Sequence, residues 1–268
     1  YFYEHEEDEE IILQTHSRGK GINLVFLGDG FNAENISNGD YLRVMNEQME
    51  RFFDIEPYRT YRDYFNVSTA IAVSQESGIG TVNTIRRTKF ETTFAGGVGL
   101  RGDYSAIFDY AMKVSSVDES NLNQSLIIVT PNTIDYGGIT EMWEDGSAIA
   151  FCPLSEDTYP YDARGIIQHE AGGHGFGKLG DEYIYHNGFI EFCCPLDFAT
   201  LNYGKSLGWY ENLSLTGKMH EVPWSHLIFD DRYSDVVDIY EGGFKHARGV
   251  FRSEQNSCMN NNISYFSA

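Results

Sequence analysis

The stretch that decides how this chain folds and works is His169-Glu170-Ala171-Gly172-Gly173-His174-Gly175-Phe176-Gly177-Lys178-Leu179-Gly180-Asp181-Glu182. Two imidazoles and a nearby carboxylate are the donor set of a three-ligand catalytic zinc site, in which water takes the fourth position. A glutamate beside the first histidine matches the general base of zinc proteases. The stretch therefore predicts a zinc hydrolase.

The spacing of the two histidines departs from the usual zinc-protease motif. His169 and His174 are five residues apart, whereas His-Glu-x-x-His separates them by four. At about 3.6 residues per turn, positions i and i+5 lie roughly 140° apart around an α-helix, so a regular helix could not direct both imidazoles to one ion. A turn widened to i→i+5 bonding would restore a common face. We therefore expect a helix that begins at Asp162 and widens over residues 171–174.

The high glycine content of this region also indicates that its sequence serves a function other than helix stability. Six of the 16 residues from 165 to 180 are glycine, and each costs about 1 kcal/mol relative to alanine in a helix interior. The alternative is a glycine-rich loop with two incidental histidines. That alternative does not explain why His-Glu, a second His and Asp-Glu fall within one short run.

The run, with its His-Glu-x-Gly-Gly-His and Leu-x-Asp-Glu-Tyr, resembles the IgA peptidase family of bacterial zinc metallopeptidases, which is related to the metzincins. The resemblance implies that His169, His174 and Asp181 hold one catalytic Zn²⁺ and that Glu170 is the general base. A structural Ca²⁺ is not indicated by the sequence.

Two departures from the metzincin motif His-Glu-x-x-His-x-x-Gly-x-x-His affect the third ligand. One extra residue lies between the histidines, and another lies between Gly177 and the third ligand, which is Asp rather than His. His186 is the alternative third ligand. The oxyanion partner is open, and Tyr183 and Tyr265 are the tyrosines nearest in sequence to the two halves of the site.

Weaker similarities extend the resemblance over residues 20 to 268. The Gly-Asp-Gly-Phe at residues 28–31 matches the opening strand of the family, and we interpret this turn as structural because no P-loop signature follows. Ser-Cys-Met-Asn at residues 257–260 resembles the Met-turn of metzincins, so Met259 is predicted to support the zinc site. In such proteins the edge strand before the active-site helix pairs with extended substrate, which implies that role for residues 137–143 or 147–151.

Composition limits the class of protein and its partners. Apolar residues make up 41% of 268 and aromatic residues 15%, which excludes a disordered chain. The net charge of −21 argues against binding to nucleic acid or an anionic membrane. No apolar run reaches the roughly 18 residues of a membrane span. We expect a protein or peptide substrate, and the sequence leaves the oligomeric state open.

The chain begins with Tyr1 rather than Met, as expected of a mature or excised segment. The expected location of the protein is secreted, periplasmic or cell-surface. Four cysteines are present, and the adjacent Cys193 and Cys194 can hardly form a disulfide with each other. In an oxidising compartment Cys152 and Cys258 would each pair with one of these two, or with each other. Four reduced thiols are the alternative.

Alternating buried strands and amphipathic helices predict an α/β fold with a mainly parallel sheet covered by helices. Strands are expected at residues 22–27, 67–73, 92–95 and 125–130, helices from Asp40 to before Pro57 and from Asp103, and a hairpin at residues 137–151. By resemblance the fold is metzincin-like, a twisted sheet with an antiparallel edge strand. The segment after the site helix is expected to be an irregular C-terminal subdomain.

The predicted organisation is an acidic arm, residues 1–19, and one catalytic domain, residues 20–268, with subdomains 20–178 and 179–268. The predicted function is zinc-dependent hydrolysis of peptide bonds in extracellular proteins by a metal-activated water, with Glu170 as base. Two alternatives remain. One is a non-catalytic protein- or glycan-binding module with a structural zinc site. The other is a serine hydrolase using Ser206 in Gly-Lys-Ser-Leu-Gly.

Overall fold

The computed structural model describes residues 5–268 and contains two compact units, with the boundary between Phe176 and Gly177. The first unit is built on a six-stranded sheet with the order β1-β3-β2-β6-β8-β7. Its strands are β1 (Glu10–Gln14), β2 (Ile22–Asp29), β3 (Phe65–Ala70), β6 (Leu126–Pro131), β7 (Ile139–Met142) and β8 (Ala148–Phe151). Strands β4 (Thr93–Phe94) and β5 (Leu100–Arg101) pair with each other and form a separate antiparallel ribbon.

The four central strands β3, β2, β6 and β8 are parallel, and both edge strands, β1 and β7, run antiparallel to their neighbours. The prediction of a mixed α/β fold with a mostly parallel sheet is therefore confirmed. The predicted hairpin is also present, because β7 pairs with β8 across the turn at residues 144–146. Of its two strands, β7 is the one at the edge of the sheet.

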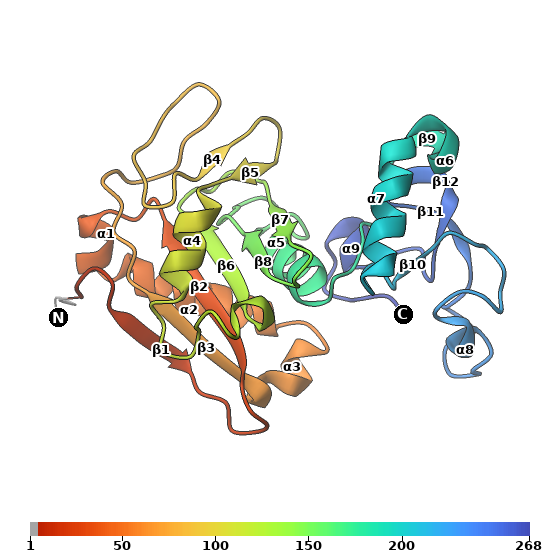
Figure 1. Cartoon of the computed structure of the whole chain (residues 1–268), viewed down its shortest axis with the longest axis horizontal. Coiled ribbons are helices and arrows are strands. Elements are labelled where there is room, and N and C mark those ends of the chain that lie inside the picture. The colour runs from red at the N-terminus through yellow and green to blue at the C-terminus, as the bar shows by residue number, and fades with distance from the viewer. Residues whose placement is uncertain (1–4) are drawn as a thin grey trace. The chain divides into compact units, whose positions relative to one another are not determined.

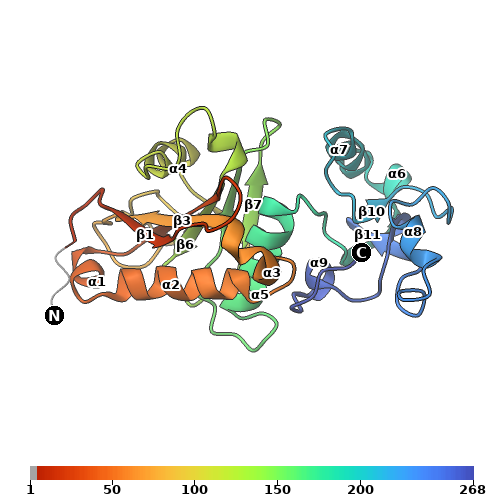
Figure 2. The ribbon, with the colours of Figure 1, turned by 90° about the horizontal axis from the view of Figure 1, so that it is seen from below.

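Helices cover both faces of this sheet (Figure 2). They are α1 (Ala33–Ser37), α2 (Asp40–Phe53), α3 (Tyr58–Tyr61), α4 (Tyr104–Ala111), α5 (Ala163–Ile167) and the π-helix η3 (Gln168–Phe176), with short 3₁₀ turns at η1 (Arg62–Tyr64) and η2 (Leu122–Gln124). Helix α4 lies on one face, whereas α2 and α5 lie on the other. The site helix therefore packs on the same side of the sheet as the long helix α2.

Alternation along each strand explains this layered packing. Val25 and Leu27 of β2 join Ile107 of α4 in one buried cluster, and the intervening Phe26 is buried on the other face. Helix α4 begins where the sequence predicts, because the side chain of Asp103 accepts a hydrogen bond from the backbone N–H of Ala106.

The turn at residues 28–30 is structural, as predicted. The Asp29 carboxylate is buried and accepts hydrogen bonds from the hydroxyls of Ser74 and Thr88 and from the backbone N–H groups of Phe90 and Thr92. A buried carboxylate requires such partners. Asp29 therefore fixes the long loop that follows β3 to the carboxyl end of β2.

Part of the segment expected as an acidic arm is ordered structure. Residues 10–14 form β1, which pairs with β3 through contacts such as Ile11 opposite Thr69. The strand contains the short apolar run Ile11-Ile12-Leu13, which was not recognised because it directly follows a run of charged residues.

The second unit contains a four-stranded sheet in which β12 (Lys245–Arg252) pairs with β9 (Ile184–Phe189), β10 (Leu213–Ser214) and β11 (Tyr240–Gly243). Its helices are α6 (Ile190–Cys193), α7 (Pro195–Ser206), α8 (Ser225–Ile228) and α9 (Cys258–Asn261). The expectation of an irregular C-terminal region is therefore wrong in part. Helix α7 was not predicted because its apolar side chains form no buried stripe. Leu196, for example, is 83% exposed.

Candidate metal centre

The helix that carries the motif changes its winding at the functional residues. Asp162 caps α5 by accepting a hydrogen bond from the backbone N–H of Gly165 at 2.9 Å. From Gln168 to Phe176 the helix is a π-helix. The predicted widening over residues 171–174 is confirmed, and it extends over nine residues rather than one turn.

This π-helix packs tightly inside the first unit. A Cβ on Gly175 would lie 2.7 Å from Leu126 Cδ1 of β6, so any larger residue at this position would require the Leu126 side chain to move. The hydroxyl of Tyr58 donates a hydrogen bond to the backbone oxygen of Gly172 at 2.5 Å. These contacts offset the poor helix propensity of the glycines and hold the widened turn in place.

His169 and His174 lie on one face of the π-helix. Their ring centroids are 4.8 Å apart and the ring planes are inclined by 81°. The ligand atoms of His169, His174 and Asp181 all lie within 4.8 Å of one another. In a tetrahedral zinc site with ligands at about 2.0–2.1 Å, two donors are about 3.4 Å apart. His169, His174 and Asp181 therefore form a group of donors that could hold a metal ion.

The carboxylate of Glu170 is positioned by the edge strand β7. Thr140 Oγ1 lies 2.9 Å from Glu170 Oε2 and 2.8 Å from the backbone oxygen of Glu170, so its hydroxyl proton can be donated to either acceptor. A Cβ on Gly138 would lie 2.9 Å from both Cγ and Oε1 of Glu170. Sequence reasoning missed Gly138 and Thr140, although the Gly-Gly pair that opens the predicted edge strand was a signal of close approach.

Asp181 is 8% exposed, and its backbone oxygen accepts a hydrogen bond from the N–H of Phe244 at 2.7 Å. Lys245 Nζ lies 3.6 Å from Asp181 Oδ2. The neighbouring Glu182 is fully buried and accepts hydrogen bonds from Asn212, Ser257 and Ser267. Burial raises the pKa of Glu182. The Glu182 carboxylate is thus engaged in holding the second unit together.

The alternative third ligand, His186, lies outside this group of donors. It is exposed on β9, and its ring packs against that of His246 at a centroid distance of 5.2 Å. Met259, predicted to support the zinc site, is fully buried in α9, and its backbone oxygen accepts a hydrogen bond from Glu182 N at 2.8 Å. The residue after Asp181 is therefore tied directly to the segment that resembles the Met-turn.

Two other predicted candidates have structural roles. The hydroxyl of Tyr265 donates to the carboxylate of Glu254, and burial together with that hydrogen bond raises the pKa of Tyr265 to about 12. Ser206 ends helix α7 and donates its hydroxyl proton to the backbone oxygen of Tyr203 at 2.6 Å. A nucleophile elbow needs a strand before the serine. The serine hydrolase alternative is therefore wrong.

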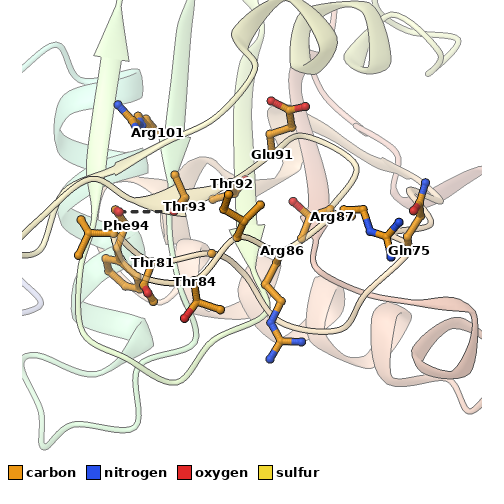
Figure 3. A pocket seen from close by; sticks show the side chains of 14 residues that line it. Gln75, Thr81, Thr84, Arg86, Arg87, Glu91, Thr92, Thr93, Phe94 and Arg101 are labelled. Atoms are coloured by element: carbon orange, nitrogen blue, oxygen red, sulfur yellow. Dashed lines mark hydrogen bonds between the residues drawn. The ribbon is translucent and has the colours of Figure 1, made fainter.

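A cavity of about 520 Å³ lies in the loop region of residues 75–101 and is lined by arginine, threonine and apolar side chains (Figure 3). Arg86, Arg87 and Arg101 contribute its basic groups. None of the motif residues lines it. The cavity is therefore separate from the candidate metal centre.

Comparison with known proteins identifies the family. The model of the family described as IgA Peptidase M64 matches residues 11–196, which is more than half of the chain and includes the whole motif. No match was found among curated proteins. Within residues 5–268, no helix has the length and apolar character that a membrane crossing requires. The donor set at the π-helix and the family match agree, and the chain belongs to the IgA peptidase M64 family of metallopeptidases, which act on proteins or peptides.

Proposed function

We propose that the chain is a zinc-dependent endopeptidase with a metzincin-like catalytic centre. The observation that carries the proposal is the grouping of His169, His174 and Asp181 donor atoms within 4.8 Å, next in sequence to a carboxylate that is not among them. A purely structural zinc site would give Glu170 no reason to be held in place by Thr140. By resemblance to its family, the chain would act on extracellular proteins from a secreted, periplasmic or cell-surface location.

When bound, zinc would polarise the scissile carbonyl and make water acidic enough to attack near neutral pH. Glu170 would take the proton of the attacking water and return it to the leaving amine. Thr140 would keep the Glu170 carboxylate in one orientation through its hydroxyl. His169 and His174 would serve as neutral imidazole ligands and Asp181 as the carboxylate ligand.

The edge strand β7 offers a binding surface for an extended peptide. It is the terminal strand of the six-stranded sheet and antiparallel to β8. Edge strands present backbone N–H and C=O groups that a peptide can pair with. Since Gly138 and Thr140 of this segment contact Glu170, a peptide paired with β7 would run beside the proposed base.

The competing function is a non-catalytic module that keeps zinc for stability alone. A peptide-cleavage assay separates the two functions. We expect cleavage of a denatured protein substrate that stops on treatment with a metal chelator and returns on addition of zinc. Zinc-loaded protein that cleaves no peptide bond in a broad set of substrates would support the binding module instead.

Replacing Thr140 by Val should lower peptidase activity without removing the metal. Valine keeps the shape of threonine but cannot donate to Glu170. A hydrogen bond to a charged group contributes about 1.5–3 kcal/mol, so we expect kcat to fall by about 10- to 100-fold. Thr133→Val, a change on the loop outside β7, is the matched control and should leave kcat close to that of the parent. An unchanged kcat in Thr140→Val would contradict the positioning role.

A further inference from the structure

The second unit contains another group of metal-binding side chains, formed by Cys193, Cys194 and His246. Their donor atoms all lie within 4.8 Å of one another. Cys193 Sγ lies 3.1 Å from Cys194 Sγ and 3.6 Å from His246 Nδ1. We propose that these three residues bind a structural zinc ion of their own, apart from the catalytic centre.

The distances fit a tetrahedral thiolate and imidazole site. With Zn–S at about 2.3 Å and Zn–N at about 2.0–2.1 Å, a sulfur and a nitrogen ligand are about 3.6 Å apart and two sulfurs about 3.8 Å apart. The Cys193–His246 distance already has this value. The two sulfurs need to separate by less than 1 Å, which thiolate repulsion across an ion would favour. Thiolate and imidazole together select zinc over calcium or magnesium.

The surroundings of His246 point independently to a metal ligand. The side chain is completely buried, and Nε2 lies 2.8 Å from Asp197 Oδ2. A carboxylate that accepts the Nε2 proton leaves the lone pair of Nδ1 free to bind a metal. This carboxylate–histidine arrangement is the usual outer shell of zinc-bound histidines. In this case Nδ1 faces the sulfur of Cys193.

The backbone leaves room for the thiols. A Cβ on Gly188 would lie 2.7 Å from both Cβ and Sγ of Cys193, so only glycine allows the thiol to occupy this position. His186 is the strand partner of His246, and the two rings are tilted by 32° at a centroid distance of 5.2 Å. His186 is exposed and is therefore the candidate for a fourth ligand, although it is not among the three residues whose donor atoms lie within 4.8 Å of one another.

An ion at this position would join three elements of the second unit. Cys193 ends α6, Cys194 precedes α7, and His246 belongs to β12. Residues 184–196 bury few apolar side chains, since Phe189, Phe192 and Leu196 are all at least 40% exposed. Small units with a limited core commonly gain stability from a structural metal. Bound zinc would therefore link α6 and the start of α7 to strand β12.

A disulfide between the two cysteines is the main chemical alternative. Within residues 5–268, no cysteine takes part in a disulfide. Adjacent Cα atoms are about 3.8 Å apart across a trans peptide, which is shorter than the roughly 4.4–6.8 Å of ordinary disulfides. Geometry therefore favours a metal over a bond between these sulfurs.

Metal analysis of the full chain tests the proposal. In His169→Ala/His174→Ala, which lacks the catalytic ligands, we expect one equivalent of zinc to remain. Adding Cys193→Ser/Cys194→Ser should remove it, whereas His226→Ala, at an exposed histidine outside the cluster, should not. Cobalt bound to the histidine variant should give thiolate charge-transfer absorption that disappears in the serine variant.

An alkylation measurement on the parent chain does not depend on the folding of any variant. Zinc should protect Cys193 and Cys194 from iodoacetamide, as mapped by mass spectrometry, with buried Cys152 and Cys258 as internal references. The proposal would be overturned if His169→Ala/His174→Ala held no zinc, or if zinc did not protect Cys193 and Cys194 from alkylation. A disulfide between Cys193 and Cys194 in the native protein would also overturn it. Failure of the proposed peptidase function would not produce these results, because none of the measurements reads peptide cleavage.

Discussion

Replacing Glu170 by Gln is expected to lower kcat for peptide cleavage by about 10²- to 10⁴-fold, the contribution usual for a general acid–base group. Glutamine has the size of glutamate, and its side-chain oxygen can still accept the hydroxyl proton of Thr140. It cannot take a proton from water at neutral pH. The substitution therefore removes the base and preserves its surroundings.

Zinc content separates this role from that of a ligand. We expect Glu170→Gln to keep the metal content and melting temperature of the parent, with KM nearly unchanged, because only an interaction specific to the transition state is lost. Glu144→Gln, at an exposed residue in the turn between β7 and β8, is the matched control and should be fully active. If Glu170→Gln cleaves as fast as the parent, the base is another residue. If it loses zinc, Glu170 is a ligand.

The parts of the fold that could be predicted are those with a strong local pattern. Strands β2 and β6 each contain a continuous apolar run of four residues, and helix α2 carries a buried stripe that includes Tyr41 and Phe52. The hairpin of β7 and β8 has a turn sequence between two apolar segments. Each of these patterns depends on neighbours within about 15 residues, which the sequence displays directly.

The second unit was harder to predict because its order depends on distant partners. The parallel pairing of β9 with β12 brings His186 opposite His246, although 60 residues separate them. Similarly, Thr140 meets Glu170 only because β7 packs beside the π-helix. Register between strands decides such contacts, and no local propensity encodes it.

The widened turn was predictable for a different reason. Helix propensity argues against residues 168–176, but a single ion shared by His169 and His174 allows few backbone conformations. The chemical constraint on the side chains therefore indicated the winding of the backbone. The extension of the π-helix to nine residues was not predictable, because it also depends on packing at Gly175 and on Tyr58.

Replacing Asp181 by Ala is expected to weaken zinc binding at the catalytic centre by more than about 100-fold. Loss of a partner that only orients a ligand costs 10–100-fold in metal affinity, and loss of a ligand itself should cost more. Two imidazoles alone leave the ion with an incomplete set of protein ligands. Zinc affinity should be measured by competition with a chelator in the Cys193→Ser/Cys194→Ser background, so that a single site is titrated.

Two neighbouring substitutions determine whether this effect is specific. Glu182→Gln exchanges an acceptor oxygen for a donor where Asn212, Ser257 and Ser267 all donate, so it should lower the melting temperature and leave the zinc affinity of the folded protein within a few fold. His186→Ala removes an exposed side chain that packs on His246. In the Cys193→Ser/Cys194→Ser variant it should change neither the melting temperature nor the zinc affinity. If His186→Ala lost zinc here and Asp181→Ala did not, the third ligand would be His186. In that case the extra residue between Gly177 and Asp181 would hold Asp181 away from the metal.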